Sequence, residues 1–342
     1  MLSKRRSRGQ RGSLLILSLW IFALLGMLAM SLAFRSRIET KIAGIRQASG
    51  PIHYAALSAV NRARRILETD PEPETDSLSD RWQEELSTGD EPGKPEGVGA
   101  FSIKIQDEES KIHLNAASAA VFENFFRLAK KEGLPLESEP ETWIAGILYW
   151  RGGSWIRRRP EGDAYYKKSL FESLDELLLI PGIKTQDVEK LKPYFTVYPQ
   201  GKAVPLRINI NTVPPIVLRS LIDSVPADAN GREKLYDQIL AFREGKIVDP
   251  TKPGQNYFLN SDLTVEKFLY RLRLPSSIQM MNLAGQLLVY FTVDSKFFRV
   301  RAALRSRAFR RYGVEAIVGP DLTMTGAAID KNRTAILAWQ RL

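Results

Sequence analysis

Side chains that could carry enzymatic chemistry are scarce in this 342-residue sequence. It contains no cysteine, which excludes a thiol nucleophile, cysteine-ligated zinc and iron–sulfur clusters. The two histidines, His53 and His113, leave little for a catalytic triad or a histidine-based metal site, and we expect His113 to be a partly exposed strand residue. Carboxylate pairs such as Glu84 and Glu85 fall in polar segments that give no support for general acid–base catalysis. We therefore predict that the chain is not an enzyme and has no catalytic residue.

The peptide bond between Gly12 and Ser13 is where the sequence does predict chemistry. Residues 1–12 carry five basic side chains and no acidic one, and residues 13–34 carry no charge. Cleavage after Gly12 would remove the basic leader and keep the apolar segment as the new N-terminus, as in prepilin-type leaders. The leader also holds half of the net charge of +10, so the basic total is weak evidence for nucleic-acid binding.

The uncharged segment 13–34 is long enough to cross a membrane. As a helix, its 22 residues would span roughly 33 Å, against about 30 Å for the hydrocarbon core of a bilayer. The basic cluster before it places the N-terminus in the cytoplasm and the rest of the chain outside. Three interpretations stay open: a prepilin-type helix, a plain membrane anchor, and a secretory signal peptide with Ala29 and Ala33 as the small residues near its cleavage site.

The remaining sequence predicts an α+β fold. Residues 35–68 continue a helical pattern, with a kink or break at Gly50-Pro51. Residues 100–106 alternate like a strand, and we expect residues 111–115 to be its hairpin partner. A helical block then separates these strands from a second group, which indicates an insertion into a sheet domain. The expected divisions are the leader 1–12, the transmembrane helix 13–34, an amphipathic helix 35–68, a loop with the first strands 69–115, a helical insertion 116–283, terminal strands 284–319 and a weakly patterned tail 320–342.

Several segments in register resemble the minor pseudopilin K family of type II secretion systems, also called general secretion pathway protein K (GspK). The leader RGQRG before SLLIL is similar to the family's processed leader, and Leu17 stands where most pilins have a glutamate that this family lacks. Further similar stretches are DEESKIHLN, EGDAYY with SLDELLLIPGI, KPYFTVYP and ININTVPPIVLRSL, at 107–115, 161–166, 173–183, 192–199 and 208–221. The resemblance runs from about residue 1 to 318.

The resemblance implies a pilin-like antiparallel sheet domain with a large helical insertion behind a long N-terminal transmembrane helix. It implies cleavage between Gly12 and Ser13 by a prepilin peptidase, N-methylation of Ser13, and packing of the 13–34 helix in a fibre. The implied place is the bacterial inner membrane and then the tip of the periplasmic pseudopilus, where the protein helps to initiate assembly for secretion across the outer membrane. The implied partners are the minor pseudopilins I and J, with H as a further one, and secreted substrates or the secretin.

Leu17 agrees with a place at the tip. A carboxylate at this position would pair with the amino terminus of the neighbouring subunit, because a charge in hydrocarbon needs a partner. Leucine makes no such pair, which is expected of a subunit that has none above it.

Calcium is a doubtful cofactor for this chain. The family's calcium sites draw on acidic loops, and this chain departs from the family's acidic pattern across residues 148–166. Glu161 and Asp163 remain there as weak metal candidates, but the neighbouring arginines 157–159 oppose a divalent cation. No other cofactor is expected.

A type IV pilus-like or DNA-uptake protein is the alternative function. Residues 173–191 look like a helix-hairpin-helix, a motif that holds phosphate at a helix N-terminus, and arginines at 157–159 and 299–311 would add phosphate contacts. Asp187 and Glu189 follow the hairpin and would repel phosphate, so packing is favoured and nucleic acid is not an expected partner. For Trp143, Trp150 and Trp155 we expect core packing first and a partner-binding patch second.

Overall fold

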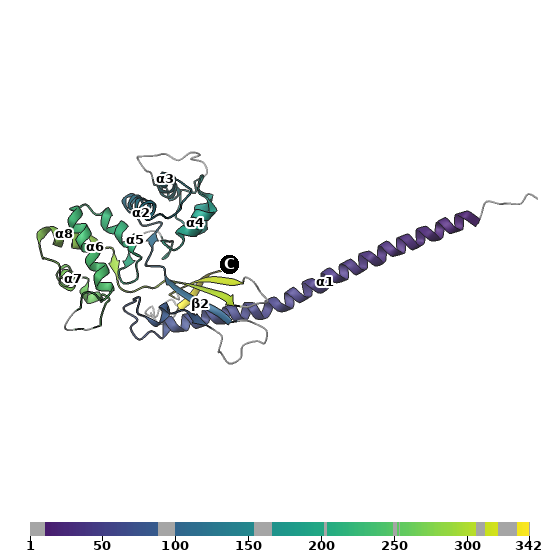
Figure 1. Cartoon of the computed structure of the whole chain (residues 1–342), viewed down its shortest axis with the longest axis horizontal. Coiled ribbons are helices and arrows are strands. Elements are labelled where there is room, and N and C mark those ends of the chain that lie inside the picture. Colours follow the sequence, from purple (N-terminus) through teal and green to yellow (C-terminus); the bar gives the residue numbers. More distant parts are fainter. Residues whose placement is uncertain are drawn as a thin grey trace, which may run out of the picture. The chain divides into compact units, whose positions relative to one another are not determined.

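The computed structural model describes residues 11–87, 100–153, 166–201, 204–248, 252, 254–305, 312–320 and 334–341. Its contacts divide the chain into two compact units, Met1–Ser58 with Glu91–Val98 and Ala59–Asp90 with Gly99–Leu342. The described part of the first unit belongs to helix α1 (Arg11–Glu68), and the second unit holds the sheet and the helical insertion (Figure 1).

Helix α1 continues through Gly50 and Pro51, so the predicted break there is wrong. Proline in a helix interior costs about 3 kcal/mol through its missing N–H donor and its ring. A helix of 58 residues has enough other backbone bonds to continue past one such position. Its stretch Leu14–Ala43 is long and apolar enough to cross a membrane. The expected N-terminal apolar helix is therefore confirmed, and its apolar stretch continues beyond residue 34.

The five-stranded sheet is antiparallel throughout, in the strand order β1-β2-β7-β8-β9. These strands are Leu86–Ser87, Ala100–Asp107, Phe298–Arg305, Gly313–Pro320 and Thr334–Arg341. Alternation along β2 buries Phe101, Ile103 and Ile105 on one face, as the period-two pattern predicts. The last turns of α1 contribute Ala59, Val60 and Ala63 as fully buried residues, so small side chains let this helix segment approach its neighbours closely.

The predicted hairpin at residues 100–115 is wrong. Strand β2 pairs with β7, whereas β3 (Ile112–His113) leaves the sheet and pairs in parallel with β4 (Phe195–Thr196). A second short parallel pair joins β5 (Ile208–Asn209) to β6 (Phe291–Thr292). Glu108, in the expected hairpin turn, is instead bound by the distant side chains of Thr196 and Arg299, which a local pattern cannot show.

The predicted tail 320–342 also differs from the structure, because β9 (Thr334–Arg341) forms an edge of the sheet. Its first residue is anchored by α1: Thr334 donates hydrogen bonds from N and Oγ1 to the Glu68 carboxylate, at 3.0 and 2.9 Å. The strand was missed because its pairing with β8 and this long-range anchor are invisible to a local pattern.

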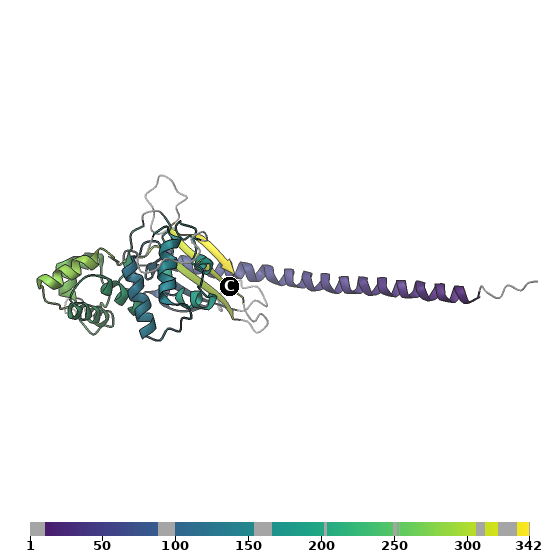
Figure 2. The ribbon, with the colours of Figure 1, turned by 90° about the horizontal axis from the view of Figure 1, so that it is seen from above.

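The helical insertion forms two groups of helices, seen in teal and in green (Figures 1 and 2). The first group contains α2 (Ala119–Lys131), α3 (Pro140–Trp150) and α4 (Thr185–Leu191), with the 3-10 turn η3 (Leu174–Leu179). The second contains α6 (Ala229–Arg243), α7 (Val265–Arg271) and α8 (Ile278–Leu288), and α5 (Pro215–Ser224) packs against both α2 and α6. Both groups belong to one hydrophobic core, in which Phe125 and Phe126 of α2 contact Phe195 of β4.

Candidate functional site

The N-terminal part of α1 carries the residues for which processing and fibre packing were predicted. Gly12 and Ser13 lie in the first turn of the helix, just after residues 1–10, which lie outside the described part of the chain. Leu17 is 58% exposed, and the other large apolar side chains between Leu14 and Phe34 are exposed as well. A helix that exposes apolar groups on all sides is suited to lipid or to packing among other apolar helices, not to water.

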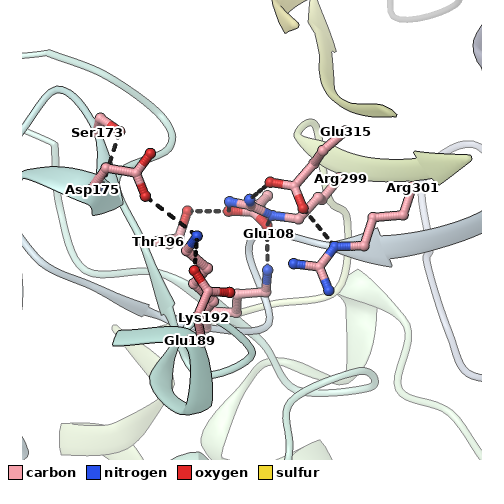
Figure 3. A network of polar contacts seen from close by, with 10 residues as sticks. Glu108, Ser173, Asp175, Glu189, Lys192, Thr196, Arg299, Arg301 and Glu315 are labelled. Atoms are coloured by element: carbon pink, nitrogen blue, oxygen red, sulfur yellow. Dashed lines mark hydrogen bonds and ion pairs between the residues drawn. The ribbon is translucent and has the colours of Figure 1, made fainter. Parts of the chain in front are cut away.

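A buried network of charges joins the helical insertion to the sheet (Figure 3). Glu108, which follows β2, is fully buried and accepts hydrogen bonds from Arg299 of β7, at 2.6 Å to Nε and 3.2 Å to Nη2. Thr196 of β4 donates to the same carboxylate at 2.6 Å, and Lys111 forms a close ion pair with it. The carboxylate is therefore held from the sheet and from the insertion at once.

The network continues into the sheet through Glu315 of β8. Arg299 and Arg301 both form ion pairs with this carboxylate, so Arg299 bridges Glu108 and Glu315. Burial alone would raise the pKa of Glu108, but the charges of Lys111 and Arg299 outweigh it and lower that pKa to about 2. Glu108 therefore stays ionised, and four bonds from Arg299, Thr196 and Lys111 hold it, so its role is to join the insertion to the sheet.

Sequence reasoning missed this joint and misinterpreted two of its members. Arg299 and Arg301 were considered as phosphate contacts of a DNA-binding protein, yet Arg299 is buried and both are paired with carboxylates. The signal that could have found the joint is the run Asp107 to Lys111, because five consecutive polar and charged residues at the end of a strand need partners if the segment is buried.

The helix-hairpin-helix-like segment packs inside the insertion. Asp187 of α4 is fully buried, and its carboxylate accepts hydrogen bonds from the backbone N–H of Glu137 and of Ser138, the latter at 2.8 Å. At the hairpin, Ile180 lies so close to α3 that a Cβ on Gly146 would be 2.4 Å from its Cγ2 atom. These contacts favour the packing role over phosphate binding, as the sequence indicated.

The two tryptophans of α3 lie in the core, which agrees with the first expectation for them. Trp143 is fully buried and stacks on Phe126, with ring centroids 5.8 Å apart. Trp150 stacks on Phe171 and donates from Nε1 to Glu176 at 2.9 Å. Trp155 lies outside the described residues.

His113 is buried and not partly exposed, which corrects the expectation for it. Its Nδ1 accepts a hydrogen bond from Asn115 N at 3.1 Å, so the neutral ring carries its proton on Nε2 and donates to Pro199 O at 2.8 Å. Burial lowers the pKa of His113, which keeps the ring neutral. Nε2 thus holds β3 to the segment after β4, and Nδ1 fixes the turn that follows β3.

The metal candidates Glu161 and Asp163 lie outside the described residues, so calcium binding there stays a prediction. Among the described acids, Asp70, Asp76 and Asp80 place carboxylate oxygens within 4.8 Å of one another. Each of these carboxylates already accepts a hydrogen bond from the chain, from Glu72 N, Ser295 N and Ser77 N respectively. Calcium takes six to eight oxygens, and three engaged carboxylates do not justify assigning it to them.

Comparison with known proteins gives a match of fold. No family model and no curated protein matches the sequence. Among solved structures, the chain matches one chain of the crystal structure of the GspK-GspI-GspJ complex from the enterotoxigenic Escherichia coli type 2 secretion system. The TM-score is 0.58 at 16% sequence identity, and the match covers 88% of this chain and 99% of that chain. The expected α+β fold, with an N-terminal apolar helix and an antiparallel sheet, is therefore confirmed.

Proposed function

We propose that this chain is the minor pseudopilin K of a type II secretion system. In this proposal it stands at the tip of the pseudopilus, bound to the minor pseudopilins I and J, and helps to initiate assembly for secretion across the outer membrane. The pseudopilin H, the secretin and secreted substrates are further partners in the proposal. The chain has a structural role and performs no catalysis.

The extent of the fold match carries this proposal. A match that covers 88% of this chain must include much of the helical insertion as well as the sheet, because the sheet and α1 alone are far shorter. The matched chain belongs to a complex of three pseudopilins. The sequence resemblance adds support from separate residues, since the leader around Gly12 and the missing carboxylate at Leu17 are independent of the folded domain.

The proposal assigns each end of the apolar helix a role. A prepilin peptidase cuts between Gly12 and Ser13, and the new N-terminus at Ser13 is then N-methylated. Before assembly the helix spans the inner membrane, with the leader in the cytoplasm and the second compact unit in the periplasm, because the basic cluster stays inside. After assembly the same apolar surface packs against the helices of neighbouring subunits.

Co-expression of the full chain with a prepilin peptidase tests the class of protein. Intact mass and N-terminal sequencing are expected to give a chain that begins at Ser13 only when the peptidase is present. Gly12→Leu should abolish the cut, and Gly9→Leu, a matched change in the same leader, should leave it intact. An uncut chain, or one cut near Ala33, would refute the proposal.

A second experiment tests the partners. The full chain, purified in detergent, is mixed with the pseudopilins I and J, and the bound fraction is measured at rising salt concentration. A stable complex with I and J is expected. Salt-sensitive binding to duplex DNA without binding to the pseudopilins would instead support the DNA-uptake function, because phosphate contacts weaken steeply with salt.

A further inference from the structure

Three carboxylates converge on the turn through which the chain leaves the helical insertion. Asp76 accepts a hydrogen bond from Ser295 N at 2.7 Å, and Asp107 accepts one from Ser295 Oγ at 2.7 Å. Glu109 accepts one from Lys296 N at 2.9 Å. We call Asp76, Asp107 and Glu109 the carboxylate clasp. The turn that it holds connects β6, the last strand of the insertion, to β7 of the sheet.

Side chains of the insertion complete the clasp from the other side. Asn209 of β5 donates from Nδ2 to Ser295 Oγ at 2.8 Å, and Thr212 donates from Oγ1 to the Asp107 carboxylate. The backbone N–H of Asn209 also donates to Glu109 O at 2.9 Å. Asp76, Asp107 and Asn209 are all buried. The clasp therefore ties the segment before the sheet, the end of β2 and the insertion to one short turn.

Most of the charged groups around the carboxylate clasp are acids, so they are negative when ionised, as the clasp itself is. The negative charges of Asp70 and Asp80 raise the pKa of Asp76. The charge of Asp294 raises the pKa of Glu109, and the charge of Glu108 raises that of Asp107. Among the residues that the structure describes, two cations lie nearby: Lys296, whose charge lowers the pKa of Glu109, and Arg207, which lines the same cavity of about 510 Å³. The neutral His113 also lines this cavity. The positive charges of Lys111 and Arg299 are already paired with Glu108. Ionised, the clasp would thus gather like charges with little compensation.

Burial and this repulsion both raise the pKa values of the carboxyl groups in the clasp. Burial first, and then the neighbouring acids, raise the pKa of Asp76 to about 9 and that of Glu109 to about 8. Burial raises the pKa of Asp107 to about 6, where hydrogen bonds from Thr212 and Ser295 limit the rise. At neutral pH the folded chain then holds protons that the unfolded chain has released.

We propose that the carboxylate clasp is a pH-responsive latch between the sheet and the helical insertion. In its protonated form it closes on Ser295 and Lys296 and fixes the joint. When Asp76 and Glu109 ionise, their negative charges and that of Asp107 repel one another, and the turn loosens. As the pH rises above neutrality, the insertion becomes more mobile at the turn that connects β6 to β7 of the sheet.

Hydrogen exchange of the full chain in non-ionic detergent tests the latch. Exchange is followed by mass spectrometry at about pH 6 and about pH 9 and corrected for the intrinsic pH dependence of amide exchange. Peptides that cover residues 291–297 are expected to lose protection at the higher pH, by roughly tenfold per pH unit for each proton released on opening. The double variant Asp76→Asn, Glu109→Gln should remove most of this change, because neutral amides imitate the protonated acids. Asp237→Asn, on the exposed face of α6, should leave it unchanged.

Equal protection of 291–297 at both pH values would overturn the latch, and so would a pH dependence that persists in the double variant. Infrared spectroscopy of the unaltered chain gives a check that does not depend on the variant folding, since protonated buried carboxyls must be present at neutral pH and absent at high pH. The exchange is also repeated with millimolar calcium chloride. If calcium ions abolished the pH dependence, a metal ion and not protons would be the partner of these carboxylates, and the proposal would fail.

Discussion

Glu108 and Arg299 form a buried ion pair, with 2.6 Å between Oε1 and Nε, although 191 residues separate them in the sequence. The pair closes a long loop that contains the entire helical insertion. Desolvating two charges is costly and is offset only when both are fully bound, as they are here by Lys111, Thr196 and Glu315. The insertion is thus attached to the sheet by a group of charges whose members depend on one another.

Replacing Glu108 by glutamine should destabilise the second compact unit strongly. The change leaves the guanidinium of Arg299 and the ammonium of Lys111 buried with a neutral partner, and breaking a buried pair in this way costs about 3–5 kcal/mol. Denaturant unfolding of the full chain in detergent, followed by tryptophan fluorescence, measures the loss. As a control, Glu233→Gln breaks an exposed ion pair with Arg219 and should have little effect. Equal effects of the two changes would contradict the buried joint.

Glu108 also predicts how stability depends on pH in acid. The pKa of Glu108 is lowered to about 2 in the folded chain, against about 4.3 for an ordinary glutamate, so its contribution is present above the ordinary pKa. That contribution is lost as the pH falls from about 4 towards 2, when the unfolded chain takes up a proton first. Thermal unfolding measured across this window should show a steep fall that is absent in Glu108→Gln.

Gly146 should tolerate no side chain where α3 meets the hairpin. A Cβ at this position would lie 2.4 Å from Cγ2 of the buried Ile180, so Gly146→Ala should force the hairpin outward and cost about 1–3 kcal/mol. Gly231→Ala is the matched control, because Gly231 lies in α6 with no atom closer than 3.8 Å to its Cβ position. That change should be neutral or stabilise the helix by up to about 1 kcal/mol. The denaturant midpoints of the two variants, compared with that of the unaltered chain, test this difference.

Asp187 should matter for folding and not for binding nucleic acid. Asp187→Ala leaves the backbone N–H groups of Glu137 and Ser138 without their acceptor, and the loss at the buried Ser138 costs about 1–3 kcal/mol. The variant should unfold at lower denaturant and exchange these two amides faster. Glu189→Ala, which removes an exposed partner of Lys192, should do neither. If removing either acid instead created strong DNA binding, the packing role of the hairpin would be wrong.

Local patterns were enough for some elements of this fold. The alternation over residues 100–106 predicts β2, and the uncharged run 13–34 predicts the apolar part of α1, because both signals come from neighbouring side chains. The acids in the hairpin-like segment also pointed correctly to packing, since Asp187 is bound inside the insertion.

Pairings over long distances could not be predicted in the same way. The partner of β2 lies nearly 200 residues later, so residues 111–115 were the nearest available candidate and the wrong one. The strand Thr334–Arg341 is held by its pairing with β8 and by Glu68, and neither partner can be recognised from the local sequence. The carboxylate clasp likewise exists only because Asp76 and Asp107 meet Ser295, and nothing in the sequence near any of them indicates the other two.

The proposed place at the tip makes a prediction for Leu17. If no subunit lies above this chain, a glutamate at position 17 has no amino terminus to pair with, and an unpaired charge in hydrocarbon is unfavourable by up to about 2.5–3.5 kcal/mol. Leu17→Glu should therefore reduce the amounts of pseudopilins I and J that co-purify with the full chain from membranes, relative to the amount of this chain present. Leu17→Met keeps the apolar character and should change nothing. If Leu17→Glu bound its partners as well as the unaltered chain and also recruited a further pseudopilin, the carboxylate would have found a partner above it, and the chain would lie within the fibre and not at its end.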